Sequence, residues 1–459
     1  MKKYTIILAA LFAFVACSKE VTVDEPSSDS TPANGEVHEL FVALPSLSDV
    51  DTKASINVAN GKFSWKAGDA IAVTTSSSVV YEFTAAADGA DGEAVRFTYS
   101  GPMNGTPATI TYPYRADGNS TALPTEIPSL TGALSAAYIR LHGTVTDNSA
   151  TLEYENAFLK VTFTNVPTFA RSIFFDGTAD DVTISGISLA EKGDVVAYIP
   201  VSASNTGFTV SIRDKNSNII TAKATSSAKS FTNGTIKNMK PVPVGKVITI
   251  NDDASKGWGE LAIWQASNSS NNYRFKTVQS YPAKLNELDD GVYYAVINLH
   301  ESGFAWAVDG VDLAVSYEES YGGSGCSTSK VFLDRDLVFS STSGTKLKSS
   351  YRIYAKPTVD SVTSMNIYVY ENWGSNTRIS EAWPGEAMTA STVRSGYYYW
   401  DLDDSYSGYN NLAIIFINNT SGNQAGDGSR LPDTSTVFDH DVTITFDHFW
   451  KESTTFDVS

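Results

Sequence analysis

The sequence is poor in cysteine and in long apolar runs, and both shortages limit what the protein can be. Its two cysteines, Cys17 and Cys326, cannot build the disulfide framework that holds many small secreted domains together. The apolar run from Thr5 to Ala16 has twelve residues, whereas a membrane-spanning helix needs roughly 20. A short apolar run after a basic start instead predicts a signal peptide at residues 1–16.

Basic residues are also scarce. The chain has 33 lysines and arginines against 51 aspartates and glutamates, which gives a formal net charge of −18. Nucleic acid and anionic membrane surfaces attract basic proteins, so this balance argues against both as ligands. A neutral polysaccharide requires no charge on its partner, and the balance neither favours nor opposes such a ligand.

Catalytic motifs are missing as well. The five histidines are scattered and form no His-Glu-x-x-His pair, and no Cys/His spacing suits a metal ion. The segment Gly322–Cys326 fails the nucleophile-elbow pattern, because Cys326 stands where the last glycine belongs. We therefore predict no metal site, no cofactor and no enzymatic activity. A minor glycan hydrolase within 246–356 stays an alternative, because a catalytic pair of carboxylates has no sequence signature.

No window shows a sustained helical stripe with capping residues, and strand patterns recur along the chain. Ala70–Val73, Phe158–Phe163 and Asp194–Pro200 are predicted strands, and Ile56–Trp65 is a predicted hairpin because Asn60-Gly61 suits its turn. The length of 459 residues allows three or four domains. The predicted fold class is all-β, with several consecutive β-sandwich domains on a lipidated flexible tether.

The first residues indicate where the protein goes. The apolar run ends at Ala16-Cys17, and this junction resembles a bacterial lipoprotein signal, with Phe14 where leucine is usual. The resemblance implies lipidation of Cys17, with acyl chains such as palmitate, and attachment to the outer membrane at the cell surface. The polar residues 17–35 would then form a flexible tether. Ordinary secretion without a lipid on Cys17 is the alternative.

Residues 36–245 carry a second set of motifs, namely Thr52-Lys53-Ala54, Trp65-x-x-Gly68-Asp69, Asn156-Ala157-Phe158-Leu159-Lys160 and Phe231-x-Asn233-Gly234. Together they resemble the fimbrillin-like family of surface lipoproteins. The resemblance implies two β-sandwich domains, at 36–145 and 146–245. It also implies that some members polymerise into pili after cleavage at a position that corresponds to Lys53. We prefer an ordinary exposed lysine there, because more than 200 residues follow the two domains.

Residues 246–356 are predicted to form a further β domain without a recognised family. Strands are expected near residues 260–264, 291–297 and 331–333. For the tryptophans of this domain we expect buried packing rather than a binding surface. They are Trp258, Trp264 and Trp306.

The last domain, 357–459, is dense in aromatic residues. Side chains of a strand alternate between its two faces. A strand at 366–370 would therefore point Ile367 and Val369 into a core, and Tyr368 and Tyr370 to the opposite face.

Trp383 precedes Pro384-Gly385, which predicts a loop at a strand edge rather than a central strand. Flat apolar rings of this kind stack on the C–H face of a sugar ring. The side-chain amides of Asn423 and Gln424 both donate and accept hydrogen bonds, as sugar hydroxyls do. These residue types in one domain indicate a sugar-binding surface.

The same residues resemble a known family. Tyr-x-Tyr at 368–370, Trp-Pro-Gly-x-x-Met at 383–388, Gly-Tyr-Tyr at 396–398, Ile-Phe-Ile-Asn-Asn at 415–419 and Asn-Gln at 423–424 look like the starch-binding carbohydrate-binding module family 26. The resemblance implies that Tyr368, Tyr370 and Trp383 form the platform for an α-glucan, with Gln424 as a polar contact. Ala425 departs from the pattern, because a polar residue is usual there.

Core packing is the alternative role for these aromatic residues. We expect it for two of the four consecutive aromatics from Tyr397 to Trp400, and Trp373 suits either role. For Tyr368, Tyr370 and Trp383 we favour binding.

The sequence thus predicts a non-catalytic, lipid-anchored surface protein that binds starch or related α-glucans through its C-terminal module. The alternative is a fimbrial or adhesin subunit whose aromatic patch contacts a protein or another glycan. The expected partners are an α-glucan, the membrane through the lipid on Cys17, and proteins of surface glycan uptake or of a pilus. Nucleic acid is not an expected partner.

Overall fold

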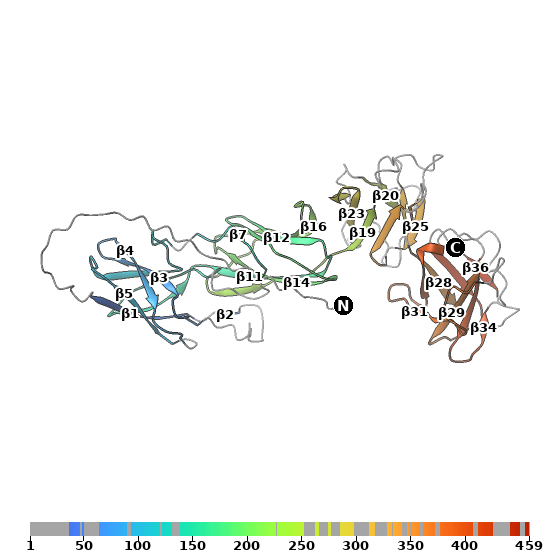
Figure 1. The fold of residues 1–459 in the computed structure, drawn as a ribbon, viewed down its shortest axis with the longest axis horizontal. Helices are drawn as coiled ribbons and strands as arrows, with labels where there is room; N and C mark the ends of the chain where they lie inside the picture. The colour runs from blue at the N-terminus through green and yellow to red at the C-terminus, as the bar shows by residue number, and fades with distance from the viewer. Residues whose placement is uncertain are drawn as a thin grey trace, which may run out of the picture.

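The computed structural model describes residues 36–45, 48–49, 64–89, 93–119, 122–130, 138–225, 227–251, 262–265, 274–276, 285–297, 312–316, 328–332, 334–341, 347–348, 350–358, 361–371, 377–406, 412–425, 441–449 and 455–458. The predicted all-β class is confirmed, because these residues form strand after strand, in four domains that lie in a row (Figure 1). None of the helices in these ranges is long and apolar enough to cross a membrane.

An eight-stranded sheet forms the first domain. Its order is β10 (Glu153–Tyr154), β8 (Leu141–Thr144), β6 (Pro107–Tyr112), β3 (Ala70–Thr75), β4 (Val80–Ala85), β5 (Val95–Ser100), β1 (Val37–Ala43) and β9 (Ser149–Thr151). The two outermost strands, β9 and β10, follow each other in the chain, so the sheet curls round a core that holds Trp65, Phe83 and Phe97. The predicted strand at Ala70–Val73 lies in β3, while the Asn60-Gly61 turn is outside the described residues.

Two sheets pack face to face in the second domain. One has the order β14 (Gly193–Val201), β11 (Ala157–Val166), β17 (Thr235–Asn238) and β2 (Ser48–Asp49), with β18 (Val242–Pro243) also on β11. The other has the order β16 (Ile219–Ala224), β15 (Phe208–Asp214), β12 (Ala170–Gly177), β13 (Asp181–Ile184) and β7 (Glu126–Ile127). The predicted strands at 158–163 and 194–200 are confirmed in β11 and β14.

The third domain, at 246–348, also has two sheets. Their orders are β22 (Asn286–Asp289), β23 (Val292–Ile297), β19 (Lys246–Asn251), β26 (Leu337–Ser341) and β27 (Leu347–Lys348), and β21 (Arg274–Lys276), β20 (Ala262–Gln265), β24 (Asp312–Ser316) and β25 (Thr328–Phe332). Val247 and Tyr294 belong to the same apolar cluster as Leu159 of the second domain. The second and third domains therefore share a continuous core.

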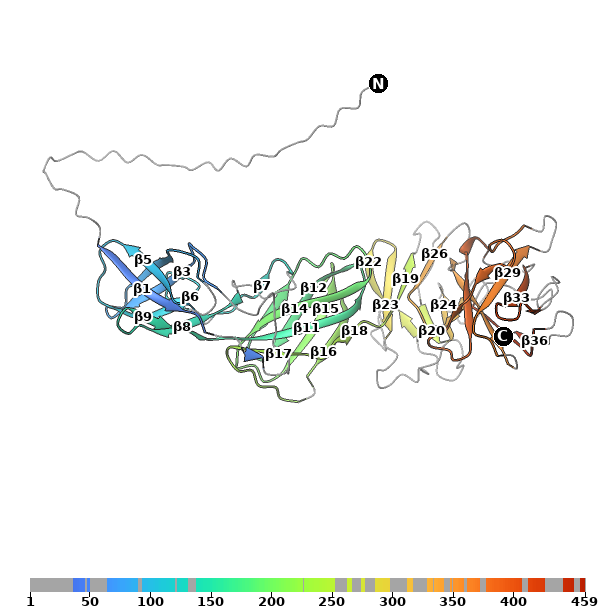
Figure 2. The same ribbon diagram turned by 90° about the horizontal axis from the view of Figure 1, so that it is seen from below.

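The fourth domain carries the predicted binding residues. One sheet has the order β31 (Thr389–Ala390), β32 (Tyr398–Leu402), β28 (Tyr351–Pro357), β35 (Val442–Phe446) and β36 (Phe456–Val458). The other has the order β30 (Glu386–Ala387), β29 (Met365–Glu371), β33 (Leu412–Asn418) and β34 (Gln424–Ala425). A short 3₁₀ turn, η3 (Asp404–Tyr406), follows β32. Figure 2 shows this domain at the end of the row of domains.

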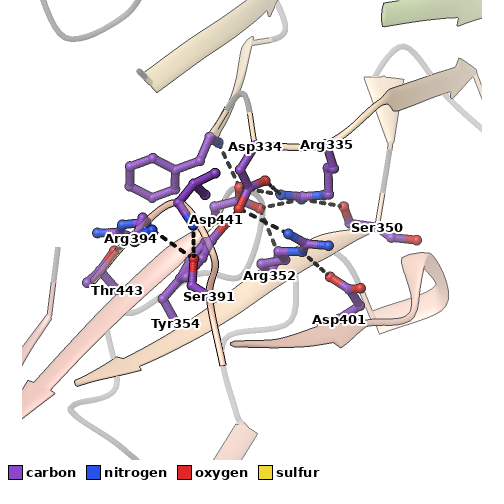
Figure 3. A network of polar contacts seen from close by, with 12 residues as sticks. Asp334, Arg335, Ser350, Arg352, Tyr354, Ser391, Arg394, Asp401, Asp441 and Thr443 are labelled. Carbon is purple, nitrogen blue, oxygen red and sulfur yellow. Dashed lines mark hydrogen bonds and ion pairs between the residues drawn. The ribbon is translucent and has the colours of Figure 1, made fainter. Parts of the chain in front are cut away.

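A buried carboxylate fastens the fourth domain to the third (Figure 3). Asp441, whose side chain is 1% exposed, accepts hydrogen bonds from the backbone N–H groups of Phe332 and Arg352, both at 2.7 Å. Its carboxylate pairs with the guanidinium of Arg335 at 3.0 Å. Burial raises the pKa of Asp441, and the Arg335 charge opposes that shift.

A second layer of the same junction surrounds that pair. Asp334, whose side chain is 2% exposed, pairs with Arg352 at 3.0 Å and accepts a hydrogen bond from the Tyr354 hydroxyl. Phe332 packs edge-on against Tyr354, with ring centroids 5.1 Å apart. These groups come from both domains, so the junction is held by several contacts that cross it.

Candidate functional site

The predicted alternation along β29 is confirmed. Ile367 and Val369 are fully buried in the core of the fourth domain, whereas Tyr368 and Tyr370 are half-buried on the other face. The two tyrosine ring centroids are 5.7 Å apart, and the ring planes are tilted by 48°. The outer face of β29 therefore presents two neighbouring rings that are not coplanar.

Trp383 completes this surface from a loop. Its side chain is 53% exposed, and its ring lies edge-on to that of Tyr368, with centroids 5.5 Å apart and planes at 72°. The sequence predicted a loop position for Trp383, and the structure places it directly before β30. We call Tyr368, Tyr370 and Trp383 the ring platform.

Gly385 explains why Trp383 lies beside Tyr368. The glycine has a φ of +85°, and a Cβ atom added there would stand 2.2 Å from the carbonyl oxygen of Ile367. Only glycine lets the loop approach the β29 backbone so closely. The side-chain amide of Asn366 also donates to the Gly385 carbonyl, at 3.3 Å.

The segment before Trp383 runs back along the same strand. The backbone N–H of Val369 donates to the Ser380 hydroxyl at 2.9 Å, and the N–H of Ile379 donates to the Val369 carbonyl at 2.9 Å. Tyr370 and Arg378 form an isolated bridge. These bonds hold both ends of the Trp383 loop against β29, so contacts within the domain fix the ring platform.

Gln424 shares a face with the tyrosines. It pairs with Ile417 across β34 and β33, and Ile417 pairs with Asn366 of β29. Directly paired residues point to the same face of a sheet, and Asn366 and Tyr368 are two residues apart on one strand. Two strand spacings put Gln424 about 10 Å from β29, at the border of the ring platform.

Ala425 is fully buried opposite Phe416. The position therefore belongs to the core of the domain and not to the ligand face, so an apolar residue fits it.

Two of the four consecutive aromatics pack against the core, as expected. Tyr398 and Trp400 are the partly buried pair, and the Trp400 indole N–H donates to the carboxylate of Glu386 at 2.7 Å. Tyr399 lies on the opposite face, with the guanidinium carbon of Arg352 3.8 Å above its ring centroid. The hydrogen bond between Trp400 of β32 and Glu386 ties β30, next to the ring platform, to the other sheet.

Sequence reasoning missed two polar supports of the platform. Glu386 holds Trp400, and the side-chain amide of Asn419 donates to Asn366 at 2.8 Å. Asn419 stood within a quoted motif, but its partner lies 53 positions away, and no local pattern points to it. Of the other predicted positions, Cys17, Lys53, Trp258, Trp306, Cys326 and Trp373 lie outside the described residues.

The fourth domain matches one known protein family. Residues 354–430 match the family model for starch-binding module 26, which confirms the predicted resemblance of the C-terminal domain. Among curated proteins, none matches the chain.

Solved structures give more distant likenesses. A family 26 carbohydrate-binding module structure from Eubacterium rectale, in complex with maltoheptaose, has 17% identity and a TM-score of 0.18, over 46% of this chain and 96% of its own. A candidate cell adhesion protein from Bacteroides ovatus has 11% identity and a TM-score of 0.28, over 46% of this chain and 92% of its own. A second such protein, from Bacteroides uniformis, has 13% identity and a TM-score of 0.24, over 45% and 93%.

Proposed function

We propose that this protein binds starch or a related α-glucan on the ring platform of its fourth domain and does not catalyse a reaction there. The observation that carries the proposal is the group of three aromatic rings, with Tyr368 5.7 Å from Tyr370 and 5.5 Å from Trp383. Such spacings let neighbouring rings meet neighbouring sugars of one chain. The match of residues 354–430 to a starch-binding family supports the same ligand class.

The tilt of the rings favours an α-linked chain. An α-1,4-glucan curves from one sugar to the next, whereas a β-1,4-glucan is a flat ribbon. Rings inclined by 48° and 72° to one another form a bent surface that follows a curved chain. Gln424, at the border of the platform, would hydrogen-bond the sugar hydroxyls.

The affinity of one platform should be modest. Each stacked ring contributes on the order of 1 kcal/mol, and little is lost in ordering because the loop is already fixed to β29. Many copies on one cell would add avidity on a long polysaccharide.

Display at the cell surface completes the proposal. A signal peptide at 1–16, a lipid on Cys17 and a polar tether at 17–35 would fix the chain to the outer membrane. The first two domains, which carry the fimbrillin-like motifs, would then act as a spacer. The fourth domain lies at the far end of the row from the first (Figure 2), which suits a site that must reach a polymer outside the cell.

Electrophoresis of the full chain through native gels with and without soluble starch tests the proposal. We expect starch to retard the wild-type protein, and Trp383→Ala to remove the retardation while the variant stays folded, because that side chain is 53% exposed. Phe41→Ala is the matched control, since Phe41 is an aromatic side chain with 45% exposure in the first domain. Equal mobility of the wild-type protein in both gels would reject α-glucan binding.

A further inference from the structure

The third domain, which shows no family motif, has the strand order of the fourth. In the fourth domain the sheets run β31-β32-β28-β35-β36 and β30-β29-β33-β34. In the third they run β22-β23-β19-β26-β27 and β21-β20-β24-β25. Each strand of one domain corresponds to the strand nine places later in the other. The two domains therefore share one topology, with β20 in the place of β29.

In the five-stranded sheets of the two domains the pairing registers agree as well. In each domain the first strand is antiparallel to one neighbour and parallel to the other. Ile248 pairs with Leu337 in the third domain, and Ile353 pairs with Val442 in the fourth. Both members of the second pair lie 105 positions after their counterparts. Corresponding residue pairs of these sheets thus recur at one fixed spacing of 105 positions along the chain.

Sequence marks recur at this spacing. Gly291 and Gly396 both have positive φ, at 70° and 78°, and each stands directly before the residues that lead into its strand. Tyr294 and Tyr399 follow three positions later, and they pair with residues that are themselves 105 positions apart. A Gly-x-Tyr-Tyr segment therefore opens the same strand in both domains.

An aspartate also occupies corresponding positions in the two domains. Asp336 accepts a hydrogen bond from the backbone N–H of Val247 at 2.9 Å, and Asp441 accepts one from the N–H of Arg352 at 2.7 Å. Again both residues of the second pair lie 105 positions after the first. Each aspartate also pairs with a cation of the preceding domain, which is Lys192 for Asp336 and Arg335 for Asp441.

We propose that residues 246–348 are a second α-glucan-binding module, a copy of the fourth domain whose site lies on β20. The inference rests on the proposed function of the fourth domain. Like β29, β20 is an inner strand of the shorter sheet. It contains Trp264, which pairs with Arg274 of β21 and Ala314 of β24, and the proposal replaces the buried packing that the sequence alone favoured for this residue. An aromatic residue thus stands on the strand that corresponds to the one with the two platform tyrosines.

The second site has fewer aromatic residues. No Trp-Pro-Gly follows β20 in the sequence, and β20 has one aromatic residue where β29 has two. With fewer rings to stack, the third domain binds the same class of sugar more weakly than the fourth.

The junction between the third and fourth domains bears on how the two proposed sites would bind one glucan. Asp441 and Asp334 are almost fully buried and bonded to groups of both domains (Figure 3). The two sites are therefore held at a fixed separation and orientation. One long glucan that reaches both sites would bind with avidity, since the second contact is intramolecular.

Hydrogen exchange of the full-length protein with and without maltoheptaose tests the inference. We expect slower exchange in peptides that contain β29 and Trp383, and separately in the peptide that contains β20. In Trp383→Ala the first protection should be lost and the second should stay. Calorimetry should show two sugars per wild-type chain and one per chain in each of Trp383→Ala and Trp264→Ala.

The possible failures are distinct. Protection limited to the fourth domain, with one sugar per chain, would overturn the second site and leave the proposed function standing. Protection of β20 that disappears in Trp383→Ala would also overturn it, because β20 would then only respond to the first site. No protection and no heat in the wild-type protein would reject both. The exchange measurement needs no change to the third domain, so a misfolded Trp264→Ala protein does not affect the test.

Discussion

The third and fourth domains have the same strand order, yet only the fourth matches a starch-binding family. The shared part is the scaffold, with its opening glycine and its junction aspartate. The differing part is the loop after the second strand, where Trp383-Pro384-Gly385 occurs in one domain and has no equivalent in the other. The fold is thus set by residues spread over the whole domain, while under the proposed function a short loop and one strand would decide how strongly the domain binds.

The two junction aspartates provide the largest expected difference between the domains. Asp441 and Arg335 have side chains 1% and 15% exposed, whereas Asp336 and Lys192 are 33% and 35% exposed. Breaking a buried pair costs about 3–5 kcal/mol, and an exposed pair contributes below about 1 kcal/mol. We expect Asp441→Asn to destabilise the fourth domain by the first amount, and Asp336→Asn to change stability by the second.

The difference in lost stability is measured by unfolding the two variants in denaturant. Hydrogen exchange of β28 monitors the fourth domain, and that of β19 monitors the third. Asparagine keeps one acceptor oxygen, which serves the single backbone N–H group bonded to Asp336 but only one of the two bonded to Asp441. The loss in Asp441→Asn therefore includes one backbone hydrogen bond as well as the charge. Equal losses in both variants would show that burial does not distinguish the junctions.

Alanine substitutions at two glycines of the fourth domain distinguish the cost of a steric clash from the cost of a strained backbone conformation. Gly385 and Gly396 have φ of +85° and +78°, but a Cβ at Gly385 would stand 2.2 Å from a backbone oxygen, while at Gly396 its nearest neighbour is Lys356 at 3.8 Å. We expect Gly396→Ala to cost about 1 kcal/mol and to leave glucan binding intact. Gly385→Ala should cost roughly 3 kcal/mol and abolish binding.

Thermal unfolding measures the stability of the two glycine variants, and the starch gel measures their glucan binding. Full glucan binding by Gly385→Ala would mean that the Trp383 loop does not need its close approach to β29.

Within the binding surface, the rings should contribute more than the amide. Loss of one stacked ring removes on the order of 1 kcal/mol, so Tyr370→Ala should weaken maltoheptaose binding about fivefold. Gln424→Ala removes one net hydrogen bond, roughly 0.5–1.5 kcal/mol, from a position at the border of the platform. Calorimetric titration gives both values, and a larger loss for Gln424 than for Tyr370 would move the centre of the site towards β34.

The smallest expected effect is a loss of folding stability at alkaline pH. Burial, together with the charges of Asp441 and Asp334, raises the pKa of Tyr354, and burial, with the charge of Asp214, raises that of Tyr294. An unfolded tyrosine ionises near pH 10, so the unfolded chain loses these protons first. Stability is therefore full below pH 10 and falls as the pH rises above it.

Unfolding curves between about pH 9 and pH 11 test the alkaline effect. Tyr354→Phe, which has no hydroxyl to ionise, should lessen the loss for the fourth domain and leave that for the third unchanged. A stability that rises above pH 10 would contradict this account.

Local patterns were enough to predict the ring platform. The alternation of Ile367 and Val369 with Tyr368 and Tyr370 gave the faces of β29, and Pro384-Gly385 gave the loop that carries Trp383. These features are local because a strand period of two and a turn residue act over a few positions.

The junctions were beyond local patterns. Arg335 and Asp441 are 106 positions apart, and neither residue signals its partner. The proposed duplication has a counterpart in the sequence, Gly-x-Tyr-Tyr and Asp-x-Asp at a spacing of 105, but matches of three or four residues gain meaning only once the strand orders are known to agree.

The most direct measurement of the central claim compares two linear glucans of equal length on the full chain by calorimetry, one α-1,4-linked and one β-1,4-linked. The tilted ring platform predicts heat of binding for the α-linked chain, none for the β-linked chain, and a marked loss of the first in Trp383→Ala. Binding of the β-linked chain as tightly as the α-linked one, or unchanged binding in Trp383→Ala, would contradict the assignment of the platform to α-glucans.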